Sequence, residues 1–134
     1  MTPDVVHFPE GLPGFEACRR YTVVTAPAFE PFCSLQGQGP GAPAFVTIDP
    51  RRVVPDFDTT LDPTDRARLQ LAPDDSAEGT PLLWLAVVTA DDVGATVNLR
   101  APIVINPQAM RGVQVLPAAS ERPLAFALTP AEGV

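Results

Sequence analysis

The chain has 134 residues, 46% of them hydrophobic, which suits a single domain with its own core. Nine basic residues, all arginine, stand against sixteen acidic ones, and the net charge at pH 7 is −7. This charge argues against a nucleic-acid partner, because binding to phosphates needs a basic surface. No apolar run approaches the roughly 20 residues of a membrane-spanning helix, and the N-terminus does not resemble a secretory signal. We therefore expect a cytoplasmic protein.

Seventeen prolines and nine glycines divide the chain into short segments without a sustained helical period, a pattern that favours β-strands. The first half holds strand candidates at residues 5–8, 21–25, 32–35 and 44–48. Residues 9–14 (PEGLPG) predict a turn-rich loop after the first strand. The glycine-rich residues 37–41 predict a hairpin between the third and fourth strands.

One short helix is predicted in the middle of the chain. Asp62 is a suitable N-cap, Pro63 suits the first helical position, and Asp65 lies in the first turn. Pro73 predicts the end of the segment, so the helix has about two turns.

The second half holds further strand candidates at residues 82–89, 95–99, 103–105, 113–116 and 124–128. The first of them is apolar on both faces and is expected to be central or buried between two layers. Seven to nine short strands with one or two short helices indicate a mostly β barrel or sandwich. We expect one domain over residues 1–134, with a C-terminal tail over residues 117–134 that frays at its end.

The side chains that support catalysis or metal binding are scarce. His7 is the only histidine and lysine is absent, so triads, Schiff bases and P-loops are not expected. Cys18 and Cys33 are interpreted as reduced thiols, and Trp84 as a core aromatic residue. The acidic pairs at positions 56 and 58, 74 and 75, and 91 and 92 lie in hydrophilic loops and are expected to be solvated. We expect no catalytic residues, no metal and no cofactor, and a protein that is not an enzyme.

Two phenylalanines stand beside acidic residues. Phe15 precedes Glu16, and Phe57 lies between Asp56 and Asp58. Partly exposed aromatic side chains are typical anchors of protein interfaces. Both phenylalanines are therefore expected to be partly exposed.

Five segments occur in an order and at a spacing that resemble a known family. They are residues 8–16 (FPEGLPGFE), 31–36 (PFCSLQ), 44–50 (AFVTIDP), 97–106 (VNLRAPIVIN) and 112–116 (GVQVL). Together they resemble the FliW family of bacterial flagellar assembly factors. The resemblance implies a compact antiparallel β-barrel with short helices.

The resemblance also implies a function. FliW proteins bind flagellin and CsrA, a small RNA-binding translational repressor. Abundant flagellin occupies FliW, and when secretion drains flagellin, the released FliW captures CsrA and relieves repression of flagellin translation. The alternatives are a flagellin chaperone without a CsrA-regulatory role, and a small-ligand carrier or enzyme in a β-barrel. We expect a monomer on its own that binds neither nucleic acid nor membrane directly.

The residues expected to bind partners are acidic, aromatic or amide side chains in loops, together with one arginine. They are Glu10, Phe15, Glu16, Asp56, Asp58, Asp74, Asp75, Asn98 and Arg100. An acidic surface suits a basic regulator such as CsrA. The alternative role is plain solvation for the acids, and a turn or a backbone hydrogen bond for Asn98.

Overall fold

The computed structural model describes residues 5–71, 82–90, 92, 94–115 and 126–128. These residues form nine β-strands, one α-helix and two 3₁₀-helices. In chain order the elements are β1 (Val5–His7), β2 (Arg20–Val24), η1 (Pro27–Phe29), β3 (Phe32–Gly37), β4 (Ala44–Ile48), η2 (Pro50–Arg52), α1 (Pro63–Arg68), β5 (Leu83–Ala90), β6 (Ala95–Val97), β7 (Ile103–Asn106), β8 (Arg111–Gln114) and β9 (Phe126–Leu128).

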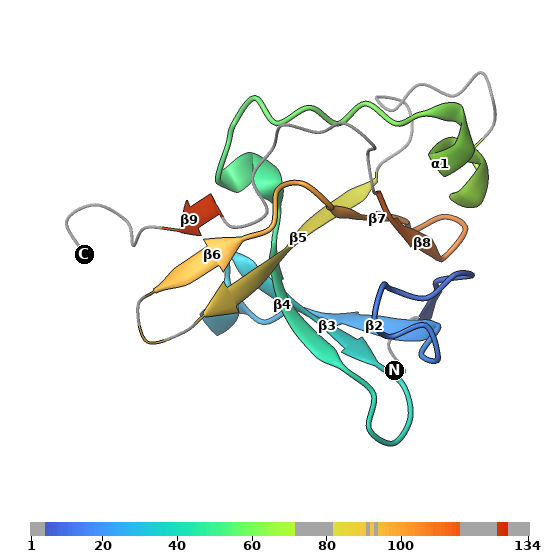
Figure 1. The fold of residues 1–134 in the computed structure, drawn as a ribbon, viewed down its shortest axis with the longest axis horizontal. Coiled ribbons are helices and arrows are strands. Elements are labelled where there is room, and N and C mark those ends of the chain that lie inside the picture. Colours follow the sequence, from blue (N-terminus) through green and yellow to red (C-terminus); the bar gives the residue numbers. More distant parts are fainter. Residues whose placement is uncertain (1–4, 72–81, 91, 93, 116–125, 129–134) are drawn as a thin grey trace.

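Seven strands close into a barrel (Figure 1). Their order is β4-β3-β2-β1-β8-β7-β5, and β5 pairs again with β4. Neighbouring strands run antiparallel, except that β1 and β8 form a parallel pair at His7 and Arg111. Strand β6 continues the sheet beyond β5, and β9 pairs with β6. The barrel is confirmed, with one parallel pair among its described strands.

Strand β5 is central, as its apolar sequence predicted. It pairs with β4 on one side and with β7 and then β6 on the other. Its side chains alternate between two cores because successive residues of a strand point to opposite faces. Leu83, Leu85 and Val87 belong to one core, and Trp84, Ala86 and Val88 to the other.

The first core fills the barrel interior. The rings of Phe8 and Tyr21 meet edge to face with centroids 5.1 Å apart. Other buried members are Val6, Leu12, Leu35, Leu85, Ile103 and Ile105. Gly112 allows this packing, because a Cβ there would lie 2.4 Å from the Phe8 ring. Burial raises the pKa of Tyr21 above its ordinary value, so its hydroxyl stays protonated inside the barrel.

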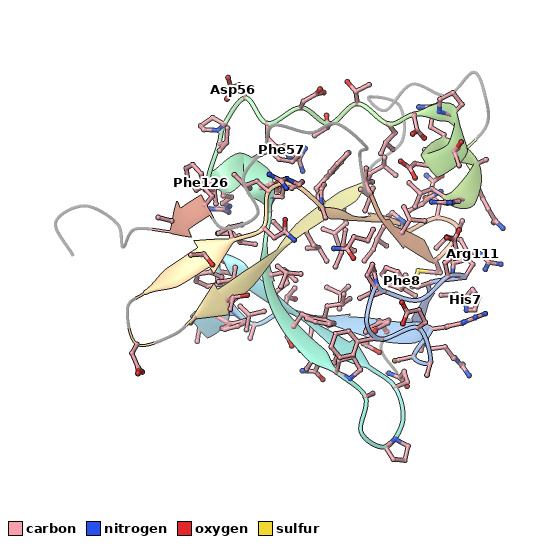
Figure 2. The ribbon with its side chains drawn as sticks, in the orientation of Figure 1. His7, Phe8, Asp56, Phe57, Arg111 and Phe126 are labelled. Atoms are coloured by element: carbon pink, nitrogen blue, oxygen red, sulfur yellow. The ribbon has the colours of Figure 1, made fainter. Side chains whose placement is uncertain are left out.

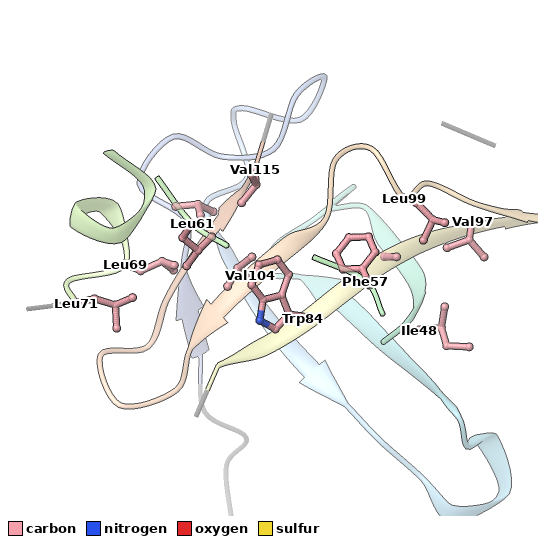
Figure 3. Packing of buried hydrophobic residues seen from close by; sticks show 12 residues of the cluster. Ile48, Phe57, Leu61, Leu69, Leu71, Trp84, Val97, Leu99, Val104 and Val115 are labelled. Atoms are coloured by element: carbon pink, nitrogen blue, oxygen red, sulfur yellow. The ribbon is translucent and has the colours of Figure 1, made fainter. Parts of the chain in front are cut away.

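The second core lies on the outer face of the barrel, beneath residues 49–71, here called the covering arm. Phe57 and Trp84 meet edge to face, 6.2 Å between ring centroids, and Leu61, Leu69 and Leu71 pack into the same cluster (Figure 3). Phe57 is only 8% exposed, so the prediction that it is partly exposed is wrong. Its backbone turns the ring inward, whereas Asp56 and Asp58 on either side are exposed.

Helix α1 forms as predicted within the covering arm. The Asp62 carboxylate accepts a hydrogen bond from the Asp65 N–H (2.8 Å), and Pro63 occupies the first turn. After the helix, the Leu69 carbonyl accepts a hydrogen bond from the buried Asn106 side chain (2.8 Å). This bond attaches the arm to β7. The predicted stop at Pro73 lies outside the described residues.

The remaining strands lie close to their predicted positions, although β8 (Arg111–Gln114) begins and ends before the predicted residues 113–116 and β6 ends at Val97 instead of residue 99. Strands β3 and β4 form the predicted hairpin, with Leu35 opposite Phe45. Of the predicted tail over residues 117–134, the structure describes Phe126–Leu128, which form β9. Cys18 and Cys33 are free thiols. Within the described residues, no helix is long and apolar enough to cross a membrane.

Candidate protein-binding site

The loop between β1 and β2, residues 8–19, folds over one end of the barrel interior and is here called the plug loop. Three backbone hydrogen bonds shape it into consecutive turns: Gly11 N–H to the Phe8 carbonyl (2.9 Å), Phe15 N–H to Leu12 (2.8 Å) and Cys18 N–H to Phe15 (3.0 Å). Leu12 is 3% exposed and belongs to the interior core. The plug loop is therefore anchored to the barrel and presents a fixed surface.

Phe15 is the most exposed large apolar side chain of the described residues, at 43%. Its ring leans edge-on against Phe45, with centroids 5.4 Å apart. The prediction that Phe15 is partly exposed is confirmed. Because one side of the ring is supported and the other is open, Phe15 can contact a partner at little cost in side-chain entropy.

A hollow of about 160 Å³ opens beside Phe15. Its walls come from the plug loop, β4, β5, β7, β8 and the segment after β6: Leu12, Pro13, Phe15, Phe45, Val87, Asn98, Ile103 and Gln114. Most of these side chains are apolar. Phe15 also borders a wider hollow of about 470 Å³, which it shares with the β3–β4 hairpin loop at residues 38–43.

The plug loop contains two acidic residues, Glu10 and Glu16. Glu10 forms an ion pair with Arg68 of α1, Oε2 to Nε 2.8 Å apart, which ties the loop to the covering arm. Glu16 is exposed and accepts a hydrogen bond from the Gly14 N–H (3.1 Å). Backbone hydrogen bonds from Glu16 itself and from Gly14 hold the pKa of Glu16 below its usual value. Both acids line a third hollow of about 210 Å³ next to β8.

Asn98 organises the connection between β6 and β7. Its side-chain oxygen accepts hydrogen bonds from the N–H groups of Arg100 (3.0 Å) and Ala101 (3.1 Å), and its own N–H donates to the Val87 carbonyl (2.9 Å). The alternative role foreseen for Asn98, a backbone hydrogen bond, is thus present. The same residue also lines the hollow beside Phe15.

Two further predicted site residues, Asp56 and Asp58, lie apart from the plug loop. Asp56 and Asp58 are exposed on the covering arm, and the Asp58 carboxylate accepts hydrogen bonds from the Thr60 N–H (2.9 Å) and hydroxyl (2.6 Å). Figure 2 shows Asp56 on a part of the surface separate from His7 at the end of β1. Asp74 and Asp75 lie outside the described residues. The predicted residues that the structure describes therefore fall into three places: the plug loop (Glu10, Phe15 and Glu16), the segment after β6 (Asn98 and Arg100), and the covering arm, whose Asp56 and Asp58 are here called the acidic arm group.

Several residues of the hollow are not predicted from the sequence, namely Leu12, Phe45, Val87 and Gln114. Alternation along the strands does place Phe45 and Val87 on the interior face. Nothing in the sequence shows that the plug loop leaves these interior residues accessible at the end of the barrel.

Asp65 is a buried carboxylate near this site, 6% exposed, in the first turn of α1. Burial raises its pKa, the neighbouring Asp62 raises it further, and Arg68 opposes both. A raised folded-state pKa favours folding below the ordinary value of 3.8, and this contribution is lost as pH rises through the folded-state pKa.

We therefore expect Asp65→Asn to melt at a higher temperature than the wild type at pH 7, with the difference vanishing below pH 3.8. Thermal unfolding followed by circular dichroism over pH 3 to 8 measures this, with the exposed Asp56→Asn as the control for loss of one charge. A less stable Asp65→Asn at pH 7 would mean that the pair with Arg68 outweighs burial.

The described residues hold no group of three or more histidine, cysteine or acidic side chains that could bind a metal ion. What the site offers is a supported aromatic ring, an apolar hollow and two acids. Such features suit recognition of another protein.

Comparisons with known proteins agree on one family. The model of the family described as "FliW protein" matches residues 1–128. The flagellar assembly factor FliW of Natranaerobius thermophilus is 34% identical over 113 residues, which cover 84% of this chain and 73% of that protein. The FliW of Syntrophus aciditrophicus is 31% identical over 123 residues, covering 92% and 76%. A crystal structure of the flagellar assembly factor FliW superposes with a TM-score of 0.81 and 28% identity, covering 96% of this chain and 88% of that one.

Proposed function

This chain belongs to the FliW family, and from that premise we propose that it is a cytoplasmic flagellar assembly factor that binds flagellin and a CsrA-type translational regulator in mutually exclusive states. Flagellin binding would leave CsrA free to repress flagellin translation. As secretion drains flagellin, the released protein captures CsrA and relieves repression. The switch needs two competing binding equilibria and no chemistry.

The flagellin site is assigned to the plug loop. Unassembled flagellin has amphipathic terminal segments whose apolar faces lack a partner. An apolar side chain of such a segment fits the hollow beside Phe15, which Asn98 also lines, and Glu10 and Glu16 line the hollow next to β8. Polar contacts to flagellin are assigned to Glu10, Glu16, Asn98 and Arg100. The observation that carries this assignment is the exposed but supported Phe15 ring at the edge of an apolar hollow.

Phe15→Ala is expected to weaken flagellin binding by about 30-fold, the effect of losing an aromatic anchor worth about 2 kcal/mol. Phe29→Ala is the matched control, because Phe29 is similarly exposed (38%) and also leans on another phenylalanine, Phe32. Calorimetric titration with monomeric flagellin measures both. Equal losses in the two variants would contradict the assignment.

The CsrA site is assigned to the acidic arm group, Asp56 and Asp58, together with Asp74 and Asp75. A net charge of −7 suits a regulator whose surface is basic for RNA binding. The acids at positions 56 and 58 are exposed and lie away from the plug loop. With separate contact surfaces, the mutual exclusion of the two partners arises from steric overlap of the bound proteins or from coupling through the barrel.

Reversing Asp56, Asp58, Asp74 and Asp75 to Arg is expected to weaken CsrA binding and reduce its sensitivity to salt. Binding kinetics at low and moderate ionic strength measure this, because exposed charges act mainly on the association rate. The control reverses two exposed acids elsewhere, Glu30 and Asp92, and is compared with the Asp56→Arg/Asp58→Arg pair. Unchanged affinity at low salt would refute the electrostatic part of the proposal.

A competition experiment tests the switch itself. Adding flagellin to a preformed complex with CsrA is expected to release CsrA, measured by size-exclusion chromatography. Binding of flagellin with no affinity for CsrA would support the alternative, a flagellin chaperone without a regulatory role. If the chain binds neither flagellin nor CsrA, the proposal is refuted. The same columns report whether the free chain is a monomer, as we propose.

A further inference from the structure

A row of basic side chains crosses three strands on the outer face of the barrel. In the strand register, His7 of β1 stands opposite Arg20 of β2 on one side and Arg111 of β8 on the other. Val6 and Phe8, on either side of His7, point into the interior, so alternation places His7 and its two partners outside. Figure 2 shows His7 and Arg111 together at the β1–β8 end of the barrel. We call these three residues the basic row.

Among the described residues, the two arginines of the basic row have no acidic partner. Arg51 pairs with Asp49 and Arg68 with Glu10 and Asp65, but among the described residues neither Arg20 nor Arg111 forms an ion pair. The chain holds 16 acids against 9 bases, so acids are not in short supply. Basic side chains on neighbouring positions of paired strands also repel one another. Replacing the two arginines of the row with uncharged polar residues is therefore not expected to destabilise the fold.

The spacing of the row indicates what it can bind. Adjacent strands lie about 4.8 Å apart, so three side chains across three strands repeat at about that interval. Acidic side chains at positions i, i+4 and i+7 of a helix repeat at about 5 to 6 Å, whereas alternate side chains of an extended peptide are about 6.7 Å apart. The side-chain spacing of a helix is therefore closer to that of the basic row than the spacing of an extended peptide is.

We propose that the basic row, Arg20, His7 and Arg111, is a docking site for the acidic face of a helix on a partner protein. Carboxylates on successive turns would accept charge-assisted hydrogen bonds from the two arginines and a hydrogen bond from a ring N–H of His7. Nucleic acid is the disfavoured occupant, because a phosphate backbone would meet the net charge of −7 around this short row. This site lies outside the plug loop and the acidic arm group, and it does not depend on the roles proposed for them.

The test uses two helical peptides of about 18 residues with identical composition. One carries three glutamates at i, i+4 and i+7 on one face, and the other distributes them around the helix. Fluorescence anisotropy at low ionic strength is expected to show binding of the one-face peptide about tenfold tighter than that of its isomer, as the loss of one charged hydrogen bond predicts. The double variant Arg20→Gln/Arg111→Gln is expected to lose this preference while melting at no lower temperature than the wild type.

The matched control is Arg51→Gln/Arg52→Gln, which removes the same charge from exposed positions on η2 and is expected to keep the preference. If the double variant of the row fails to fold, the single variants Arg20→Gln and Arg111→Gln are compared instead. The proposal is overturned if the wild type binds neither peptide, if it does not distinguish the isomers, or if both double variants lose binding equally. Tighter binding of an oligouridylate than of the one-face peptide would also overturn it.

Discussion

Phe57→Ala is expected to lower the free energy of unfolding by about 3–5 kcal/mol, the usual cost of removing a buried phenylalanine side chain. The ring is 8% exposed and lies against Trp84, in the core between the covering arm and the barrel. Its loss leaves a cavity where the arm crosses β5. Chemical denaturation followed by the fluorescence of Trp84, the one tryptophan of the chain, reports on this contact directly.

Asp56→Ala is the control for this prediction, because Asp56 is the exposed neighbour of Phe57 and its replacement is expected to change stability by no more than about 0.5 kcal/mol. A similarly small change for Phe57→Ala would show that the covering arm is not part of the cooperative fold.

The sequence predicted most strands correctly because their apolar and alternating patterns are local. The most informative was the segment around Trp84, whose apolar residues on both faces indicated a strand between two cores. Closure of the barrel was accessible only through the family resemblance. It depends on the pairing of β1 with β8 at His7 and Arg111 and on the pairing of β4 with β5, and strands so far apart in the chain leave no local sequence pattern of their pairing.

At the candidate site, the sequence did not distinguish an exposed phenylalanine from a buried one. Phe15 and Phe57 both stand beside acids, and both were expected to be partly exposed. Only Phe15 is exposed, because it lies in a tight turn at the end of the barrel, whereas Phe57 lies on a segment pressed against β5. The difference is set by tertiary packing. The hollow beside Phe15 was not predicted because it too depends on tertiary packing: its walls come from segments that are far apart in the chain.

Gly11→Ala is expected to abolish flagellin binding if the plug loop forms the flagellin site. Gly11 has φ +66°, and a Cβ there would lie 2.7 Å from the Glu16 Cα and 3.0 Å from its carbonyl oxygen. These are backbone atoms and cannot move aside as a side-chain end can, so the turn that supports Phe15 must open. We also expect a stability loss of about 2 kcal/mol or more, from backbone strain and from exposure of Leu12.

Gly14→Ala separates the effect of the clash with backbone atoms from the effect of a positive φ. Gly14 also has a positive φ, +86°, but a Cβ there meets nothing within 4 Å. Its replacement carries only the conformational strain of about 1 kcal/mol and leaves the turn intact, so flagellin binding should persist. Calorimetric titration and thermal melting of both variants test this. If Gly11→Ala binds flagellin as the wild type does, although its melting temperature falls, the plug loop is a structural closure of the barrel and the flagellin site lies elsewhere.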